Sequence, residues 1–376
     1  MQYVNLEQIA DILNGYNFKS SNYVNHGVRV IRITNVQQGY LEDKDPVFYE
    51  YTKDLDKYML KENDLLMSLT GNVGRVGMLV PSLLPAGLNQ RVACIRCKND
   101  NFNIKFLFYF FNNELFRKNA VSNSNGVAQL NLSTEWLKKV KIPAYDENKQ
   151  YKIVEEIDNI VDLIDNTKKH LTNLDNIVKS QFIEMFDESD FPIRKIEEVC
   201  SLKSGTTFDK SSELEFGDIL YCKVSDMNLE GNEKFMIRSK TYVSNEVGLK
   251  SSIPAYSTIF PKRGGAIGTN KKRLLIKDTC VDLNTMGVTP SNKINPEYLY
   301  QYFQNLDLGS LCDGSTIPQL NNKNIGPLSI KVPPIELQNK FADFVQQIDK
   351  SKFIIHKQIK LLEELLDKKM HEYFGD

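Results

Sequence analysis

Short apolar runs separated by Gly, Asn and Pro fill two long stretches of the chain, residues 1–146 and 189–334. Short apolar runs that are flanked by turn residues are typical of β-strands. The strands that we expect are Val28–Val36, Asp64–Leu69, Val76–Val80, Arg91–Cys97, Ile219–Val224, Thr258–Pro261, Arg273–Ile276 and Gly287–Thr289. Each stretch also predicts one short helix, Ile104–Asn112 and Pro296–Gln304, because each of these segments follows an Asn that suits a helix N-cap.

A different pattern follows each stretch. Apolar positions recur at alternating spacings of four and three residues over 153–185 and again over 341–373. A sustained period of about 3.5 residues is the pattern of a helix that packs on another helix. We therefore predict helices in residues 147–188 and 335–376 that pack antiparallel as a coiled coil. The predicted seam consists of Ile157, Ile160, Ile164, Leu171, Leu174, Val178, Val345, Ile348, Ile355, Ile359, Leu362 and Leu366.

The two halves of the chain repeat each other. The recurring segments are Ala128-Gln129-Leu130-Asn131 with Val140-Lys141-Ile142-Pro143, which return 190 residues later as Pro318-Gln319-Leu320-Asn321 with Ile330-Lys331-Val332-Pro333. A unit of this length exceeds the periods of solenoid repeats, so it indicates a duplicated domain. The fold that we predict is α+β, with two repeated globular domains joined by the two long helices.

Composition limits the classes of function. The chain has 47 Lys and Arg against 48 Asp and Glu, so any contact with DNA must be local or shared with a partner. Of the six cysteines, only Cys94 and Cys97 have a suggestive spacing, and no second pair completes a zinc site. We expect reduced cysteines in a cytoplasmic protein. No run approaches the roughly 18 apolar residues of a membrane helix, and the first residues lack the pattern of a signal peptide.

Two glycine loops at equivalent places, Thr70–Arg75 and Arg263–Lys271, are the first candidates for a binding site. Neither has the Gly-Lys-Ser/Thr ending of a nucleotide-binding loop. Glycine allows close approach to a ligand, and neighbouring basic residues suit a phosphate backbone. Asn and Gln, frequent in the repeated segments, suit adenine edges. The candidate DNA contacts are Thr70, Asn72, Arg75, Asn89, Arg91, Asn123, Asn125, Gln129, Lys262, Arg263, Thr269, Asn270, Lys271, Lys272, Asn284, Thr316 and Gln319. Ordinary hairpins and turns remain the alternative for these segments.

No catalytic or metal-binding set emerges from the sequence. Asn295-Pro296-Glu297-Tyr298 is similar to a motif of amino-methyltransferases, but it also suits the capped start of a helix, and no Gly-x-Gly cofactor loop precedes it. The four histidines have no pair or triad spacing, and we find no nuclease set of acidic residues and lysine. The sequence therefore favours a binding protein over a catalyst.

This layout resembles the specificity subunit of a Type I restriction–modification system. The resemblance rests on two domains that each end in a Gln-Leu-Asn segment and a proline-terminated strand. It also rests on the helix starts Gln150-Tyr151-Lys152-Ile153-Val154 and Gln338-Asn339-Lys340-Phe341-Ala342, and on the terminal Phe186 and Phe374. It implies target-recognition domains at 1–146 and 189–334, with a central conserved helix at 147–188 and a distal one at 335–376.

The resemblance also implies a function. Subunits of this family have no catalytic site and bind no cofactor of their own. They read a bipartite, asymmetric site in double-stranded DNA, one half-site per domain. They assemble with two methyltransferase subunits that use S-adenosylmethionine, which we expect to dock on the outer faces of the helices. Restriction subunits that translocate DNA with ATP and Mg complete the enzyme.

Two other classes of protein stay open. One is a stand-alone DNA-binding repressor or scaffold, although a helix-turn-helix pattern is missing. The other is a single-chain methyltransferase or nuclease, which would need the cofactor loop or the acidic set that the sequence lacks.

Overall fold

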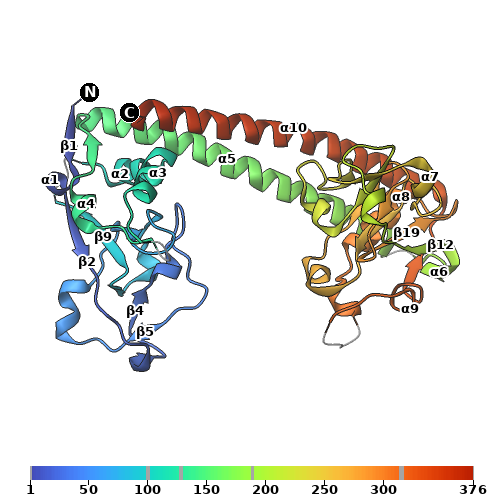
Figure 1. The fold of residues 1–376 in the computed structure, drawn as a ribbon, viewed down its shortest axis with the longest axis horizontal. Helices are drawn as coiled ribbons and strands as arrows, with labels where there is room; N and C mark the ends of the chain where they lie inside the picture. Colours follow the sequence, from blue (N-terminus) through green and yellow to red (C-terminus); the bar gives the residue numbers. More distant parts are fainter. Residues whose placement is uncertain (1, 99–101, 127–129, 188–189, 313–316, 376) are drawn as a thin grey trace. The chain divides into compact units, whose positions relative to one another are not determined.

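The computed structural model describes residues 2–98, 102–126, 130–187, 190–312 and 317–375. The chain forms two compact units: unit 1 contains Met1–Lys168 and Lys357–Asp376, and unit 2 contains Lys169–His356. Each unit contains one globular domain and a part of each long helix (Figure 1). We call the globular part of unit 1 the first domain and that of unit 2 the second domain.

The first domain contains two four-stranded sheets, in the orders β2-β9-β6-β7 and β3-β5-β4-β8, and the antiparallel pair β1-β10. Helices α2 and α3 follow β9 in the chain, and α2 packs on the sheet β2-β9-β6-β7. The elements of the first domain are β1 Tyr3–Asn5, α1 Leu6–Ile9, β2 Ala10–Asn14, η1 Ser20–Asn22, β3 Tyr23–Val24, β4 Val28–Ile31, η2 Ile33–Asn35, β5 Phe48–Tyr49, η3 Lys53–Tyr58, β6 Leu65–Ser68, β7 Val76–Met78, η4 Pro81–Leu83, β8 Ala86–Leu88, β9 Val92–Cys97, α2 Ile104–Asn112, α3 Glu114–Ser122, α4 Thr134–Lys138 and β10 Lys141–Pro143.

The second domain repeats this plan with a five-stranded sheet, β12-β19-β16-β17-β14, a three-stranded sheet, β15-β13-β18, and the pair β11-β20. Its elements are β11 Ile193–Lys195, α6 Ile196–Val199, β12 Cys200–Ser204, η6 Lys210–Ser212, β13 Ile219–Cys222, η7 Val224–Asn228, β14 Phe235–Met236, β15 Tyr242–Val243, α7 Asn245–Gly248, β16 Thr258–Pro261, η8 Gly264–Thr269, β17 Arg273–Leu275, β18 Cys280–Val281, β19 Thr285–Pro290, α8 Pro296–Gln304, η9 Gly309–Leu311, α9 Asn322–Ile325 and β20 Ser329–Lys331. The long helices are α5 Glu147–Phe182, which ends in the π-helical turn η5 Ile183–Asp187, and α10 Ile335–Phe374.

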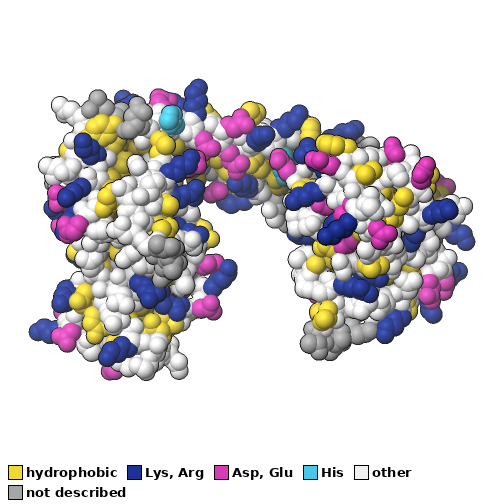
Figure 2. Space-filling model, viewed as in Figure 1, with side chains coloured by type: hydrophobic (Ala, Val, Ile, Leu, Met, Phe, Trp, Pro, Cys, Tyr) yellow, Lys and Arg dark blue, Asp and Glu magenta, His cyan; other side chains and the backbone are white. Residues whose placement is uncertain are grey.

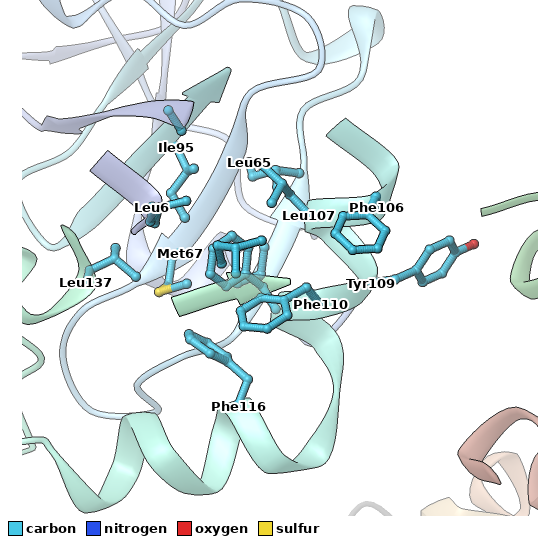
Figure 3. Close-up of a cluster of buried hydrophobic side chains, with 14 of the residues drawn as sticks. Leu6, Leu65, Met67, Ile95, Phe106, Leu107, Tyr109, Phe110, Phe116 and Leu137 are labelled. Carbon is cyan, nitrogen blue, oxygen red and sulfur yellow. The ribbon is translucent and has the colours of Figure 1, made fainter. Parts of the chain in front are cut away.

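The core of the first domain lies between the sheet β2-β9-β6-β7 and helix α2. Leu65, Met67 and Ile95 point from the strands toward Phe106 and Phe110 of the helix (Figure 3), and all five are buried. The two short helices have the bounds that the sequence predicted, because an Asn caps each of them. The side chain of Asn103 accepts the N–H groups at the start of α2, and Asn295 does so for α8.

The long helices pair antiparallel, as the sequence predicted. In unit 1, Lys168 near the middle of α5 forms an ion pair of 2.9 Å with Glu363 near the end of α10. In unit 2, Asp175 further along α5 pairs with Lys352, which lies earlier in α10, at 2.5 Å. All the seam positions predicted above are buried or half-buried in the structure.

A buried glutamine fixes the start of each long helix to a globular domain. Gln150 accepts a hydrogen bond of 2.9 Å from the backbone N–H of Asn103 and donates to the carbonyl of Tyr145 at 2.9 Å. Gln338 accepts in the same way from Asn295 at 2.8 Å. Each glutamine is at most 1% exposed. The family-like starts of the two helices therefore have a structural reason, because the glutamine satisfies the first backbone N–H at the cap of α2 or α8.

The last aromatic residue of each long helix packs into a domain core. In unit 1, the ring of Phe374 lies 5.2 Å from that of Phe106. In unit 2, the ring of Phe186 lies 4.7 Å from that of Tyr298. Helix α5 thus begins in unit 1 and contributes its last turn to the core of unit 2, and α10 does the reverse.

The structure corrects the register of the repeat. The sequence pattern aligned Leu130 with Leu320, but the backbone N–H of Leu132 is the one that donates to Leu69, at 2.8 Å, as Leu320 donates to Lys262 at 2.9 Å. Leu132 and Leu320 are 2% and 0% exposed, so they fill the same core position. The second Gln-Leu-Asn segment therefore corresponds to Asn131-Leu132-Ser133, two residues after the segment that looks most similar.

One buried polar pair differs between the domains. Asp64, 2% exposed, is held by Arg96 through two contacts of 2.6 and 2.7 Å. At the same register in the second domain the hydroxyls of Ser257 and Thr289 lie 2.7 Å apart. Either pair satisfies the buried polar atoms at this place, which is why the frame accepts both.

Candidate nucleic-acid interface

Strand pairing relates the candidate residues of one domain to those of the other. Leu65 pairs with Ile95 in β6 and β9, and Thr258 pairs with Val288 in β16 and β19. Extending this register through the backbone hydrogen bonds of the flanking loops gives matched polar positions. These matched pairs are Thr70 with Arg263, Arg75 with Lys271, Arg91 with Asn284, and Asn131 with Gln319.

The first glycine loop connects β6 to β7 and is held closed by Ser68. The hydroxyl of Ser68 donates to the carbonyl of Asn72 at 2.5 Å and accepts from the N–H of Arg75 at 3.1 Å. Gly71 and Gly74 have φ of 71° and 77°, a backbone that other residues rarely adopt. The loop therefore presents its side chains from a fixed backbone.

Two pockets border this loop and a third adjoins one of them, and we call the three together the first-domain groove. The central one has a volume of about 310 Å³ and shares lining residues with each of the other two. The lining residues are Asn17, Phe18, Lys19, Ser20, Ser21, Tyr23, Arg32, Ile33, Thr34, Val36, Gln37, Thr70, Gly71, Asn72, Val73, Arg75, Asn89, Gln90, Arg91, Arg117, Lys118, Val121, Ser122 and Leu130.

The groove carries basic and neutral polar side chains. Among the described residues that line it there is no Asp or Glu, whereas Lys19, Arg32, Arg75, Arg91 and Arg117 all face it. A surface with this composition suits a phosphodiester backbone and the polar edges of bases. The positive charge is local, because on the face that Figure 2 shows Lys and Arg mix with Asp and Glu over both units.

The first-domain candidates fall into three groups. Thr70, Asn72, Arg75, Asn89 and Arg91 line the groove. Asn123 and Asn125 are exposed but do not line it, and Asn125 instead pairs with the backbone of Asn131. Gln129 lies outside the described residues. The structure therefore brings together five of the first-domain candidates.

The second glycine loop differs in length and in burial. It is three residues longer and folds into η8, with Arg263 and Thr269 exposed on it. Lys262 and Lys272 were expected to contact DNA, but they are 7% and 1% exposed. They occupy the register positions of Leu69 and Val76, which are core positions of the first domain, so we exclude both from the interface.

Lys272 instead makes hydrogen bonds inside the protein. Its ammonium donates to Oδ1 of Asn270 at 2.8 Å and to the carbonyl of Leu306 at 2.7 Å. Burial lowers the pKa of Lys272 to about 8. Asn270 also accepts from the N–H of Leu308 at 2.9 Å, so this second candidate holds the loop that follows α8. Lys262 is tied in a similar way to the hydroxyl of Ser204 at 2.8 Å.

The remaining second-domain candidates are accessible. Lys271 is half-buried, borders a pocket of about 790 Å³ within unit 2, and donates to the side-chain oxygen of Asn228. Asn284 is exposed and Gln319 is half-buried. Thr316 lies outside the described residues.

The described residues offer no cluster of metal ligands. They contain no group of three His, Cys, Asp or Glu side chains that could hold a metal ion. None of the six cysteines forms a disulfide, and burial raises the pKa of Cys200 and Cys222 to about 12, far above neutral pH. None of the described helices is long and apolar enough to cross a membrane.

Comparison with known families gives the identity of the repeat. The family model described as the Type I restriction modification DNA specificity domain matches residues 1–176 and again residues 188–364. The chain belongs to this specificity family. The two matches correspond to the two repeats, each with one domain and most of the following helix.

Curated relatives agree with the family. The MjaVIII specificity subunit of Methanocaldococcus jannaschii is 28% identical over 182 residues, 47% of this chain and 43% of the relative. The EcoBI specificity subunit of Escherichia coli is 29% identical over 178 residues, 47% and 35% of the two chains. The chain thus spans less than half the length of these two relatives. The MjaIX specificity subunit of M. jannaschii is 25% identical over 366 residues, 87% and 84%.

Solved structures share the fold of the specificity family. A chain from a study of complex assembly and conformational transition of the type I R-M system matches with a TM-score of 0.63 at 14% identity, covering 99% of this chain and 97% of that one. The S subunit from M. genitalium matches with a TM-score of 0.55 at 15% identity, covering 100% and 96%. These likenesses show the same arrangement of two domains and two long helices.

Proposed function

We propose that this chain is the DNA sequence-specificity subunit of a Type I restriction–modification enzyme. It reads a bipartite, asymmetric site in double-stranded DNA, with residues 1–146 on one half-site and residues 189–334 on the other. The observation that carries the proposal is the set of matched polar positions: one backbone frame, used twice, bears different side chains. A catalytic role has no residues to support it in the described part of the chain.

The differences within the matched pairs explain why the site is asymmetric. Thr70 occupies the position in the first domain that Arg263 occupies in the second, and Arg91 likewise corresponds to Asn284. Hydrogen-bonding groups as different as these select different base edges. Two equal domains would read two copies of one half-site, whereas these two domains read two different half-sites.

The first-domain groove supplies both kinds of contact that such recognition needs. Exposed basic residues such as Arg91 and Arg117 give affinity that depends on salt and not on sequence. Amides and hydroxyls fixed by the loop, such as Asn72 and Thr70, give discrimination between bases. The near-neutral net charge suits a clamp on DNA to which partner subunits contribute part of the positive charge.

The partners that we propose are two methyltransferase subunits, which carry S-adenosylmethionine, and restriction subunits, which use ATP and Mg. The complex acts in the cytoplasm. Support for docking comes from large apolar side chains that stay exposed on the two long helices. They are Tyr151, Leu163, Ile177, Phe353, Ile354, Leu361 and Leu365, which are 40% to 64% exposed.

A methylome map tests the proposal. Cells that express this chain with its methyltransferase partner are compared with cells that express the methyltransferase alone. We expect a split, asymmetric methylated motif only when this chain is present. If the two proteins co-purify and no motif appears, the reading of DNA is refuted. If they neither co-purify nor methylate, the stand-alone repressor or scaffold replaces this proposal.

A further inference from the structure

We propose that Arg75 and Lys271 each read one guanine, Arg75 in the half-site of the first domain and Lys271 in that of the second. Gln37 and Asn228 are the positioning residues that orient these two cations. This inference rests on the proposed function and adds to it the residue, the base and the division between the half-sites.

The two cations occupy one position of the repeated frame. The backbone N–H of Leu79 donates to Asp64 at 2.9 Å, and that of Leu275 donates to Ser257 at 2.9 Å. The residues just before that aspartate and serine, Asn63 and Tyr256, have φ of 66° and 65°, so both strands begin with the same unusual turn. Arg75 and Lys271 each lie four residues before the leucine of this match, although the loops that lead to them differ in length and sequence.

The two amides also occupy one position of the frame. In the first domain the N–H of Arg32 donates to the side chain of Asn35 at 2.8 Å, and in the second the N–H of Lys223 donates to Asp226 at 2.9 Å. Each of these acceptors closes a 3-10 turn, η2 or η7. Two residues after the acceptor stands an amide, Gln37 in the first domain and Asn228 in the second.

The cation and the amide meet in both domains. Nη1 of Arg75 donates to Oε1 of Gln37 at 2.8 Å, and Nζ of Lys271 donates to Oδ1 of Asn228. The pair is Arg with Gln in the first domain and Lys with Asn in the second, so both residue types differ, yet the contact is kept. A contact that recurs with different residues indicates that the pairing itself has a role.

A neutral amide orients a cation without neutralising it. A carboxylate partner would cancel the charge, as Asp64 does for Arg96. Gln37 leaves the charge of Arg75 and its remaining N–H donors available, but it restricts where the guanidinium points. Fixed orientation matters little for a phosphate contact and greatly for a base edge, where Arg and Lys pair with O6 and N7 of guanine.

The surroundings of Arg75 suit a base rather than a phosphate alone. The pocket of about 310 Å³ that it lines contains Ile33 and Val36 and has no second charged group among the described residues. Base edges are read through hydrogen bonds together with apolar contacts, so a lining of apolar side chains beside one arginine favours a base.

Three acidic residues line the pocket that Lys271 borders, and each has another partner: Glu233 accepts the backbone N–H of Gly231 at 3.0 Å, and the two aspartates pair with other lysines. Asp349 holds Lys234 at 2.5 Å, and Asp175 holds Lys352 at 2.5 Å. The oxygen of Asn228 is the acceptor that the structure gives to Lys271. The second domain therefore keeps a charged donor in an oriented position, as the first domain does.

The test is the methylated motif that the full complex produces with each variant. We expect Arg75→Ala to relax one guanine of one half-site to any base and to leave the other half-site unchanged. Lys271→Ala should do the same in the other half-site. Loss of a bidentate contact worth roughly 1–3 kcal/mol corresponds to a fall in discrimination at that base pair of about 5- to 150-fold.

The positioning residues and a control give the second readout. Gln37→Ala should relax the same base pair as Arg75→Ala, but by a smaller factor, and Asn228→Ala should match Lys271→Ala. The control is Arg117→Ala, an exposed arginine of the same groove. It should weaken binding to all sequences alike and lower the salt slope of binding by about one.

The outcomes separate this inference from the proposed function. No motif with the unchanged protein refutes the function itself. A motif without guanine in either half-site, or one that Arg75→Ala and Lys271→Ala leave unchanged, refutes only the guanine assignment. Equal loss at every base pair with a reduced salt slope shows a phosphate contact and also refutes it. If Arg75→Ala fails to fold, Gln37→Ala and Arg75→Lys test the guanine assignment instead. The first variant keeps Arg75 itself, and the second keeps a cation at the same position.

Discussion

Replacing Gln150 by methionine removes the polar end of a buried side chain and keeps its size. Gln150 is 1% exposed, so no water is at hand to take over its hydrogen bonds. The change leaves the N–H of Asn103 and the carbonyl of Tyr145 without the partners they have at 2.9 Å in the structure. Both groups belong to the junction between α5 and the first domain, so this junction should weaken first.

The magnitude follows from those two groups. Leaving a buried donor or acceptor unsatisfied costs roughly 1–3 kcal/mol, so the two groups together cost about 2–6 kcal/mol. For a domain of roughly 150–250 residues, each 1 kcal/mol lowers the unfolding midpoint by about 2–4 °C. We therefore expect the midpoint of unit 1 to fall by about 4–24 °C.

The assay uses the single tryptophan of the chain, Trp136, which packs against the core of the first domain. Thermal unfolding followed by its fluorescence reports unit 1 selectively. The matched control is Gln358→Met on α10, an exposed glutamine of the same unit. A midpoint for Gln150→Met within 2 °C of this control would refute the argument that the buried glutamine fixes the helix to the domain.

Further predictions address docking, the buried ion pair and pH. Leu361→Asp, at a side chain that is 64% exposed, should abolish co-purification with the methyltransferase and leave the unfolding midpoint unchanged, whereas Gln358→Asp should bind normally; equal binding by both variants would contradict docking on α10. Asp64→Ser should cost about 3–5 kcal/mol by stranding the charge of Arg96, and adding Arg96→Thr should restore at least half, since the pair then copies the hydroxyl pair of the second domain; no recovery in the Trp fluorescence midpoint would count against this. Lys272 has a folded pKa of about 8, below its unfolded value of about 10.4, so its burial penalty is full below pH 8 and disappears as pH rises toward 10.5. The stability of the unchanged protein relative to Lys272→Met, measured by urea unfolding, should therefore rise by up to about 3 kcal/mol from pH 7 to pH 10.5, and a flat difference would show that the buried lysine is not strained.

Elements defined by local chemistry were predictable from the sequence. An asparagine cap followed by a run of aromatic and apolar residues gave the bounds of α2 and α8, because capping and amphipathic spacing act within a few residues. The seam of α5 and α10 was visible for the same reason, since its phase is repeated over many turns. The antiparallel pairing then followed from the two-fold repeat.

Register and burial in the loops were not predictable in this way. Gln129-Leu130-Asn131 looks most similar to the second segment, but the core selects Leu132, and only the backbone bond to Leu69 reveals it. Lys262 and Lys272 seemed part of a basic cluster. Successive side chains along a strand point to opposite faces, so Lys262 and Lys272 point inward while Lys271 stays accessible. Because the second loop is longer, the sequence alone does not show which of these lysines point inward.

The residues that the sequence analysis missed had a signal. Gln37 and Asn228 end two segments that match position by position in chemical type, Arg32-Ile33-Thr34-Asn35-Val36-Gln37 and Lys223-Val224-Ser225-Asp226-Met227-Asn228. The similarity lies in cations, β-branched or apolar residues and amides, and not in identical letters. Aligning the two segments by chemical type rather than by identity shows that Gln37 and Asn228 occupy equivalent positions of the repeat.

The position of Phe374 sets a condition on any replacement of the first domain. Replacing residues 1–146 alone leaves this aromatic residue unchanged, because it lies at the end of α10. The incoming domain must then place an aromatic ring at the position of Phe106, where it contacts Phe374. In the second domain, Tyr298 makes the equivalent aromatic contact with Phe186. A replacement domain can therefore carry different loops as long as it keeps the aromatic contact with the end of α10.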